Sequence, residues 1–206
     1  MPVIVVANPK GGVGKSTIAT NLAGAFARAG HAVMLGDVDR QQSARQWLGL
    51  RPQILPVIRG WDVAHDEVVR PPRGTTHVVL DTPAGLHGRK LDDVMRIADR
   101  LIVPLQPSLF DIQASHAFVQ QLLAHKRSNK VRVGVIGMRV RQGTIATDQL
   151  RHFLDALDVP VLAMLRDTQL YVQVAARGAT LWDVTPSRVE RDIAQWQPIL
   201  DWLKKP

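Results

Sequence analysis

Short apolar runs alternate with longer amphipathic segments along the chain. The apolar runs have the length and β-branched content of buried strands, at residues 3–7, 32–35, 77–80, 100–104, 131–138 and 159–163, with one more short strand after a proline-rich turn at 51–56. The other segments have a helical spacing of apolar residues, at 16–29, 42–48, 91–98, 111–126, 147–157 and 188–204. This alternation predicts an α/β fold: a single domain over 1–206, with a mostly parallel twisted sheet flanked by helices on both faces.

Composition narrows the class of protein. Hydrophobic residues make up 46% of the 206 residues, which is enough for one sizeable core. The absence of cysteine excludes disulfides, thiolate metal sites and iron–sulfur clusters. No segment approaches the roughly 20 apolar residues of a membrane span, and residues 3–7 are too short for a signal sequence. We therefore expect a soluble, cytoplasmic protein.

Basic residues outnumber acidic ones. The formal net charge is +8 and the pI is near 10.6. A surplus of this size favours a polyanionic partner, either nucleic acid or an acidic membrane surface. An arginine-rich genome would produce the same surplus without any such partner, so charge alone leaves both interpretations open.

A glycine-rich segment with two lysines follows the first predicted strand. Residues 9–17, Pro-Lys-Gly-Gly-Val-Gly-Lys-Ser-Thr, end like a phosphate-binding loop, although Pro9 stands where that pattern has its first glycine. Successive glycines let backbone N–H groups surround phosphate oxygens at a helix N-terminus. Lys15 would neutralise the β- and γ-phosphates, and the Ser16 hydroxyl would ligate magnesium. The predicted nucleotide-binding residues of the loop are Lys10, Gly11, Gly12, Val13, Gly14, Lys15, Ser16 and Thr17.

Residues 10–17 match K-G-G-x-G-K-[ST]-T at every position, and the chain thereby resembles the deviant-Walker ATPases of the ParA/MinD type. The resemblance implies a P-loop NTPase fold with ATP and Mg²⁺ as cofactors. It also implies a homodimer formed with ATP. In that dimer Lys10 would reach the phosphates bound by the second copy, acting like an arginine finger supplied in trans.

Three aspartates follow predicted strands and extend the resemblance. Asp37-Val38-Asp39 matches the family's D-x-D-P-Q segment except that Arg40 replaces its proline, and Asp81 ends an apolar run like a Walker B aspartate. The carboxyl ends of parallel strands meet at one edge of a sheet, which would bring these side chains to the phosphate loop. In the resulting prediction, Asp39 orients the attacking water. The predicted metal ligands are Ser16, Asp37 and Asp81, and the predicted catalytic residues are Lys10, Lys15 and Asp39.

Two further positions bear on the nucleotide. Residues 129–132, Asn-Lys-Val-Arg, lack the aspartate of the N-K-x-D element that recognises guanine, so the sequence favours ATP over GTP. Arg139, at the end of a predicted strand, is placed near the base. Gly85 offers a flexible point for a loop that senses the γ-phosphate.

Two surfaces compete as the place where a dimer would dock. Arg166, Arg188 and Arg191 are candidates for DNA phosphates, and such contacts would weaken steeply with salt because they do not read bases. The last predicted helix carries an apolar stripe that could instead enter a membrane surface, formed by Ile193, Trp196, Leu200 and Leu203. Packing of this stripe on the core, and the acidic residues of the same helix, make the membrane the less favoured partner.

These features predict a small ParA-like ATPase without an N-terminal helix-turn-helix extension. ATP binding would drive dimerisation, the dimer would bind DNA non-specifically, and a ParB-like partner or cargo adaptor would stimulate slow hydrolysis to ADP and phosphate. The cargo would be a plasmid, a chromosome region or a protein complex, and the ATP-bound chain would associate with the nucleoid. The alternatives are a MinD-like membrane regulator and an ATP-dependent metabolic enzyme on the same scaffold.

Overall fold

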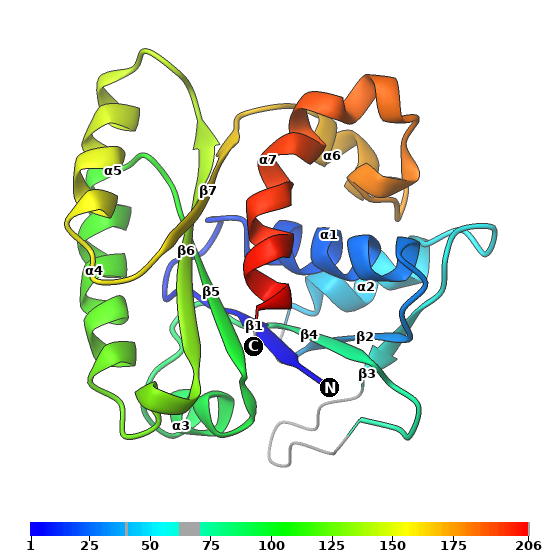
Figure 1. The fold of residues 1–206 in the computed structure, drawn as a ribbon, viewed down its shortest axis with the longest axis horizontal. Coiled ribbons are helices and arrows are strands. Elements are labelled where there is room, and N and C mark those ends of the chain that lie inside the picture. The colour runs from blue at the N-terminus through cyan, green and yellow to red at the C-terminus, as the bar shows by residue number, and fades with distance from the viewer. Residues whose placement is uncertain (40, 62–70, 206) are drawn as a thin grey trace.

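The computed structural model describes residues 1–39, 41–61 and 71–205, which form a seven-stranded sheet with helices on both faces (Figure 1). The strand order is β3-β2-β4-β1-β5-β6-β7, and all neighbouring strands run parallel. The strands are β1 (Val3–Val6), β2 (Val33–Asp37), β3 (Ile58–Trp61), β4 (His77–Asp81), β5 (Arg100–Leu105), β6 (Arg132–Val140) and β7 (Val161–Arg166). The helices are α1 (Lys15–Arg28), α2 (Ser43–Leu50), α3 (Gly88–Ile97), α4 (Leu109–Leu123), α5 (Ile145–Asp155), α6 (Leu170–Ala175) and α7 (Pro186–Lys204), with short 3₁₀ helices η1 (Ser128–Lys130) and η2 (Leu181–Asp183). The predicted fold class is confirmed.

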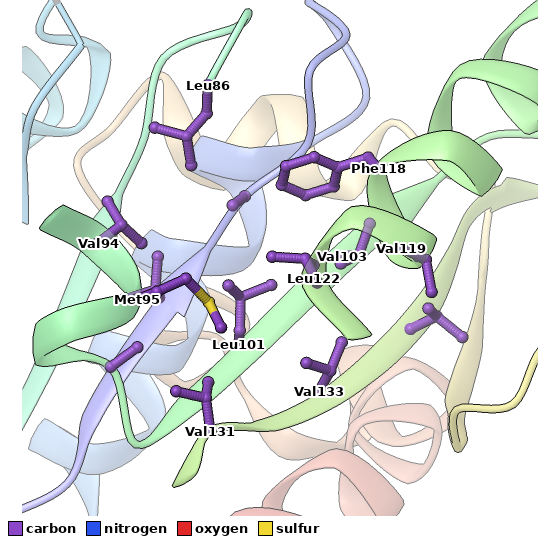
Figure 2. Close-up of a cluster of buried hydrophobic side chains, with 14 of the residues drawn as sticks. Leu86, Val94, Met95, Leu101, Val103, Phe118, Val119, Leu122, Val131 and Val133 are labelled. Atoms are coloured by element: carbon purple, nitrogen blue, oxygen red, sulfur yellow. The ribbon is translucent and has the colours of Figure 1, made fainter. Parts of the chain in front are cut away.

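Alternate residues of each strand point to opposite faces of the sheet. In β1, Val3 and Val5 belong to the apolar layer beneath α3, α4 and α5, whereas Ile4 and Val6 belong to the layer beneath α1, α2 and α7. Figure 2 shows the first layer, where side chains from α3, α4 and the strands point into one cluster. Both faces are covered, so the inner strands are almost continuously apolar, and this made them visible in the sequence.

The main difference from the sequence prediction lies after β7. The apolar pattern predicts no element between residues 164 and 187, whereas the structure has α6 and η2 there. Helix α6 is six residues long, which is too short for an amphipathic period to show. Elsewhere the predicted elements exist with shifted ends, since β6 continues to Val140 and α7 begins at Pro186, and the short η1 is an addition to the prediction.

The apolar stripe of α7 faces the sheet. Trp196 is fully buried, Leu203 is nearly so, and Ile193 and Leu200 pack partly buried against the same cluster. The expectation that this helix packs on the core is therefore confirmed. No helix in the described part of the chain is long and apolar enough to cross a membrane.

The carboxyl ends of β1, β2 and β4 meet at one edge of the sheet. The register pairs Asp37 with Asp81, and Asp81 with Val6, the last residue of β1. The chain then leaves β1 and enters the glycine-rich loop before α1. The sheet thus brings two of the predicted acidic residues together at the base of the predicted phosphate loop.

Candidate nucleotide-binding site

The glycine-rich loop has the backbone that a phosphate cradle needs. Gly12 and Gly14 have φ values of +74° and +97°, in the left-handed region that residues with a side chain rarely adopt. A Cβ on Gly14 would also lie 2.7 Å from the Cε of Met138. Space is open around Gly11 and Gly12, whereas Val13 is buried and anchors the loop. The loop ends at the first turn of α1, whose free N–H groups favour an anion.

Asn8 fixes the start of this loop. The side chain is fully buried, and its Nδ2 donates to the carbonyl oxygen of Pro104 at 2.8 Å and to the Oγ of Ser115 at 2.9 Å. Its Oδ1 accepts the N–H of Lys10 at 2.8 Å. One satisfied amide therefore joins β1, β5 and α4 and sets the backbone of Lys10. Asn8 carries no motif of its own, so its role becomes visible only when these three elements are adjacent.

Lys15 lies largely buried inside the curve of the loop. Its Nζ donates a hydrogen bond to the carbonyl oxygen of Lys10 at 2.6 Å. Burial lowers the pKa of Lys15, while the nearby charges of Asp81 and Asp39 act to raise it. The ammonium group is thus held where the phosphate of a nucleotide can take the place of the carbonyl oxygen.

Asp81 and Ser16 form the part of the site that suits a metal ion. Burial raises the pKa of Asp81 to about 7; a hydrogen bond with Ser16 and the charge of Lys15 oppose this shift, and the charge of Asp37 adds to it. The buried Oδ1 of Asp81 has no hydrogen-bond partner among the described residues. An unpaired carboxylate oxygen beside a serine hydroxyl fits Mg²⁺, which prefers oxygen ligands and bridges to substrate phosphates.

Asp37 holds the helix that follows it. Its Oδ1 accepts the N–H of Asp39 at 2.9 Å, and its Oδ2 accepts the N–H groups of Ala44 at 2.8 Å and Arg45 at 3.2 Å. Ala44 and Arg45 lie in the first turn of α2, so Asp37 caps this helix from the end of β2. Its contribution to a magnesium site stays a prediction.

Asp39, unlike Asp37, lies on the wall of the cavity above the loop. Its Oδ1 accepts only the N–H of Gln41, at 3.0 Å, among the hydrogen bonds of the described residues. An acidic side chain on this wall is compatible with orienting a water molecule, which stays a prediction. Arg40, where the sequence departs from the family pattern, lies outside the described residues.

The cavity has a volume of about 670 Å³. Most of the predicted nucleotide-binding residues line it, namely Gly11, Gly12, Gly14, Lys15, Ser16, Thr17 and Arg139, and so does Asp39, which was predicted to orient the attacking water. The predicted residues that do not line it are Lys10, Val13, Asp37 and Asp81. Gly85, predicted as a flexible point of a loop that senses the γ-phosphate, lines it too. Lining residues beyond those that the sequence suggested are Val38, Gln41, Ser43, Pro83, Ala84 and Lys90. These come from the β2–α2 and β4–α3 connections and from the first turns of α2 and α3, whose place around the loop depends on the sheet.

Arg139 reaches this cavity from an unusual backbone. Its φ is +52°, although it is not a glycine, and the register between β6 and β7 shifts around it. Such a conformation costs roughly 1 kcal/mol or more and occurs where the surrounding structure requires it. The preceding residue, Met138, packs against Gly14 of the loop. The predicted position of Arg139 at the nucleotide site is thus compatible with the cavity wall, and its contact with the base stays a prediction.

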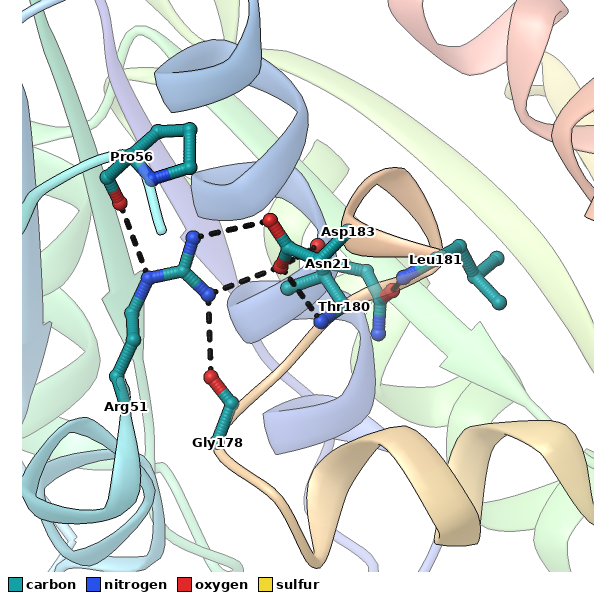
Figure 3. A network of polar contacts seen from close by, with 7 residues as sticks. All are labelled: Asn21, Arg51, Pro56, Gly178, Thr180, Leu181 and Asp183. Carbon is teal, nitrogen blue, oxygen red and sulfur yellow. Dashed lines mark hydrogen bonds and ion pairs between the residues drawn. The ribbon is translucent and has the colours of Figure 1, made fainter. Parts of the chain in front are cut away.

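A buried polar network ties the helix of the phosphate loop to the region after β7 (Figure 3). Arg51 donates to both carboxylate oxygens of Asp183, at 3.0 and 3.3 Å, and to the carbonyl oxygens of Gly178 and Pro56. The N–H of Leu181 donates to Asn21 of α1 at 3.1 Å. Breaking a buried ion pair of this kind costs about 3–5 kcal/mol, so the network fixes α1, α2 and η2 as one unit.

The arginines predicted to contact DNA have different surroundings. Arg166 donates to both carboxylate oxygens of the buried Asp192 at 2.7 and 2.8 Å, which commits its guanidinium to α7. Arg188 and Arg191 are exposed. Arg191 also lines a small hollow of about 210 Å³ at the ends of β6 and β7, together with Arg166, Arg141 and Arg151. Only part of the predicted set is therefore free to meet a phosphate.

Comparison with known proteins agrees with this geometry. The chain is 40% identical over 116 residues to the maintenance of carboxysome distribution protein A of Gloeobacter kilaueensis; the alignment covers 53% of this chain and 51% of that protein, so the chain spans about half of that relative's length. It is 25% identical over 189 residues to the protein of the same name from Halothiobacillus neapolitanus, covering 88% and 87% of the two chains.

A solved structure and a family model also resemble this chain. An ATP complex of McdA from Cyanothece superposes with a TM-score of 0.72 at 16% identity, covering 97% of this chain and 96% of that one. Residues 4–181 match the model of the CobQ/CobB/MinD/ParA nucleotide binding domain, which confirms the resemblance drawn from the lysine-bearing loop. The chain therefore belongs to the CobQ/CobB/MinD/ParA family of nucleotide-binding domains.

Proposed function

We propose that this chain is an ATPase that dimerises on binding ATP and uses the dimer to position a cargo on DNA. The observation that carries the proposal is the arrangement around the loop. Lys15 and the unpaired oxygen of Asp81 lie side by side with Ser16 beneath a cavity large enough for a nucleotide.

The chain's own groups divide the work on ATP. Backbone N–H groups of the loop and of the first turn of α1 bind phosphate oxygens, and Lys15 exchanges the Lys10 carbonyl for a phosphate. Ser16 and Asp81 would hold Mg²⁺, which would supply positive charge near the β- and γ-phosphates. Asp37 keeps α2 in place, and Asp39, on the cavity wall, orients the attacking water.

The geometry of Lys10 supports a shared site. Its N–H is held by Asn8 and its carbonyl oxygen by Lys15, so its backbone is fixed on both sides. Its side chain does not line the cavity of its own chain. A lysine with a fixed backbone that lies outside its own cavity suits the phosphates of a second copy, where it would stabilise the charge that develops during hydrolysis.

The basic hollow at the ends of β6 and β7 supports DNA as the surface on which the dimer moves. Arg151 and Arg191 are exposed there, whereas Arg166 and Arg141 are paired with Asp192 and Asp167. Exposed arginines bind phosphates of any sequence. The names of two relatives, both concerned with carboxysome distribution, favour a protein assembly as the cargo, with a cargo adaptor as the partner that stimulates hydrolysis.

A membrane as the docking surface is less well supported. The stripe of α7 that would have to enter the bilayer is already packed in the core, and Trp196 within it donates its Nε1–H to Tyr171 at 2.9 Å. Inserting this stripe into a bilayer would first require a large buried apolar area to be withdrawn from the core, which would destabilise the fold.

The test is a gel shift on DNA of arbitrary sequence with ATP, ADP or no nucleotide, at two salt concentrations. We expect a shift with ATP and Mg²⁺ only, weakened strongly by the higher salt, and none for Lys15→Ala. Binding that is equal with and without ATP would refute the positioning mechanism. Liposome sedimentation with ATP, as a parallel measurement, should recover no protein.

A further inference from the structure

Lys90 is a charged residue on the wall of the nucleotide cavity to which no motif gives a role. It is the third residue of α3, it is exposed, and it lines the cavity. The ion pairs found among the described residues do not include it. Its charge is therefore available to a ligand in the cavity.

The backbone around Lys90 is well fixed. Leu86 and Leu91, on its two sides, are both 2% exposed and anchor the segment in the core (Leu86 is labelled in Figure 2). The N–H of Gly85 donates to the carbonyl oxygen of Pro9 at 2.8 Å, which joins this segment to the start of the phosphate loop. The position of the Lys90 Cα relative to the loop is thus set before any nucleotide binds, and only its side chain has to move.

Lys90 and Arg139 lie at opposite ends of the loop. The segment of Lys90 is bonded to Pro9, where the loop begins, whereas the residue before Arg139 packs on Gly14, where the loop ends and α1 starts. The segment of Lys90 also follows β4, whose last residue is Asp81, a predicted metal ligand. The predicted contact of Arg139 with the base would place the terminal phosphate at the other end of the loop, on the side of Lys90.

The N-terminus of α3 adds to the positive potential around Lys90. The first turn of α3 contains no acidic residue, and its N-terminus contributes the positive end of the helix dipole. We propose that Lys90 contacts the terminal phosphate of the bound nucleotide and makes the site distinguish ATP from ADP. This inference rests on the proposed function, since it assigns one more contact to the same site.

Neighbouring Arg89 provides a matched control. It has the same charge, lies in the same helical turn and is exposed, but it does not line the cavity. A charge-assisted contact to a partly exposed phosphate is expected to contribute about tenfold in affinity. Removing Arg89 should leave affinity within about twofold, because a surface charge outside the cavity acts only through screened solvent.

The experiment is calorimetric titration with Mg²⁺ and either ADP or a non-hydrolysable ATP analogue. We expect Lys90→Gln to lose about tenfold in affinity for the ATP analogue and less than twofold for ADP, Lys90→Arg to recover the affinity, and Arg89→Gln to match the unaltered chain. The same losses should persist in a Lys10→Ala background, which removes the proposed dimer contact. Equal losses for both nucleotides, no loss, or a loss that vanishes in the Lys10→Ala background would overturn the inference. Failure of the unaltered chain to bind either nucleotide would instead refute the proposed function.

Discussion

The phosphate loop and the basic hollow at the ends of β6 and β7 both present positive charge, but they are built in different ways. In the loop, Lys15 is buried and bonded, and Asn8 fixes the backbone of Lys10. In the hollow, Arg151 and Arg191 are exposed on helix surfaces. A site that is organised before its ligand arrives binds one ligand in one geometry. Loosely held surface charges bind phosphates in many geometries and without reading the base sequence. We therefore expect the loop to bind one nucleotide in a fixed geometry and the hollow to contribute only non-specific contacts.

The largest expected effect is at the centre of the loop. Lys15→Ala removes the buried ammonium group inside the phosphate loop, and we expect ATP affinity to fall by about 100-fold or more because a charge-assisted contact would be lost in a desolvated site. Titration with a fluorescent ATP analogue measures the change. Arg191→Ala is the matched control, and its nucleotide affinity should equal that of the unaltered chain. Similar losses of ATP affinity in the two variants would contradict the distinction between the phosphate loop and the basic hollow.

Asp39→Ala separates hydrolysis from binding. Asp39 lines the cavity and accepts one backbone N–H from Gln41, so its removal leaves the loop and the capping role of Asp37 intact. We expect phosphate release to fall by about 100-fold, the range of a lost general base, with ATP affinity within about twofold of the original. Loss of ATP binding in this variant would show that Asp39 shapes the site rather than acting on water.

The buried carboxyl of Asp81 should make the stability of the ligand-free chain depend on pH. Its folded pKa of about 7 lies above the unfolded value near 4, so between these values the folded chain keeps a proton that the unfolded chain has released. The free energy of unfolding therefore falls as pH rises through this window, by at most about 4 kcal/mol. We expect Asp81→Asn to remove this fall and to raise Tm at pH 8, while it abolishes the Mg²⁺ dependence of ATP binding.

Thermal denaturation from pH 5 to 8 measures the effect as a difference between the two chains. This difference isolates Asp81 from His77, whose pKa is lowered to about 4, chiefly by burial, and whose contribution to stability therefore rises with pH. Parallel curves for the two chains would contradict the assignment of an unpaired, desolvated carboxyl to Asp81.

The sequence was informative where function required a local pattern. The phosphate loop needs glycines at consecutive positions, and Gly12 and Gly14 indeed have the left-handed backbone that excludes other residues. Buried parallel strands need apolar runs, and these located the strands of the sheet. Each of these two patterns is formed by residues that are close together in the sequence. Both could therefore be recognised without knowledge of the fold.

Other features depend on residues far apart in the sequence. Asn8 acts through Ser115 and Pro104, about a hundred positions away, and Gly178 is needed because a Cβ there would lie 2.4 Å from the backbone nitrogen of Arg51. The pairing of Arg166 with Asp192 is a further contact that joins distant parts of the chain. Contacts of this kind produce no recognisable pattern in the sequence, because elements such as α7 and β7 become neighbours only when the whole core is packed.

The smallest expected effects are at the hollow, where no single charge is decisive. Arg151→Ala and Arg191→Ala should each weaken DNA binding about three- to tenfold, and each should reduce the slope of log affinity against log salt by about 1. Arg166→Ala should instead lower Tm, because it leaves the buried Asp192 without its partner. Salt titrations by fluorescence anisotropy and a thermal melt distinguish these results. A loss of nucleotide affinity in Arg151→Ala would contradict the separation of the basic hollow from the nucleotide site.

We propose above all that this chain dimerises only when ATP is bound. The most direct measurement is sedimentation velocity of the Asp39→Ala chain with Mg²⁺ and ATP, with Mg²⁺ and ADP, and without nucleotide. We expect twice the monomer mass with Mg²⁺ and ATP only, and a return to the monomer when Lys10→Ala is added, because Lys10 would then no longer reach the second site. The same mass under all three conditions, or an ATP dimer that is indifferent to Lys10, would contradict this proposal.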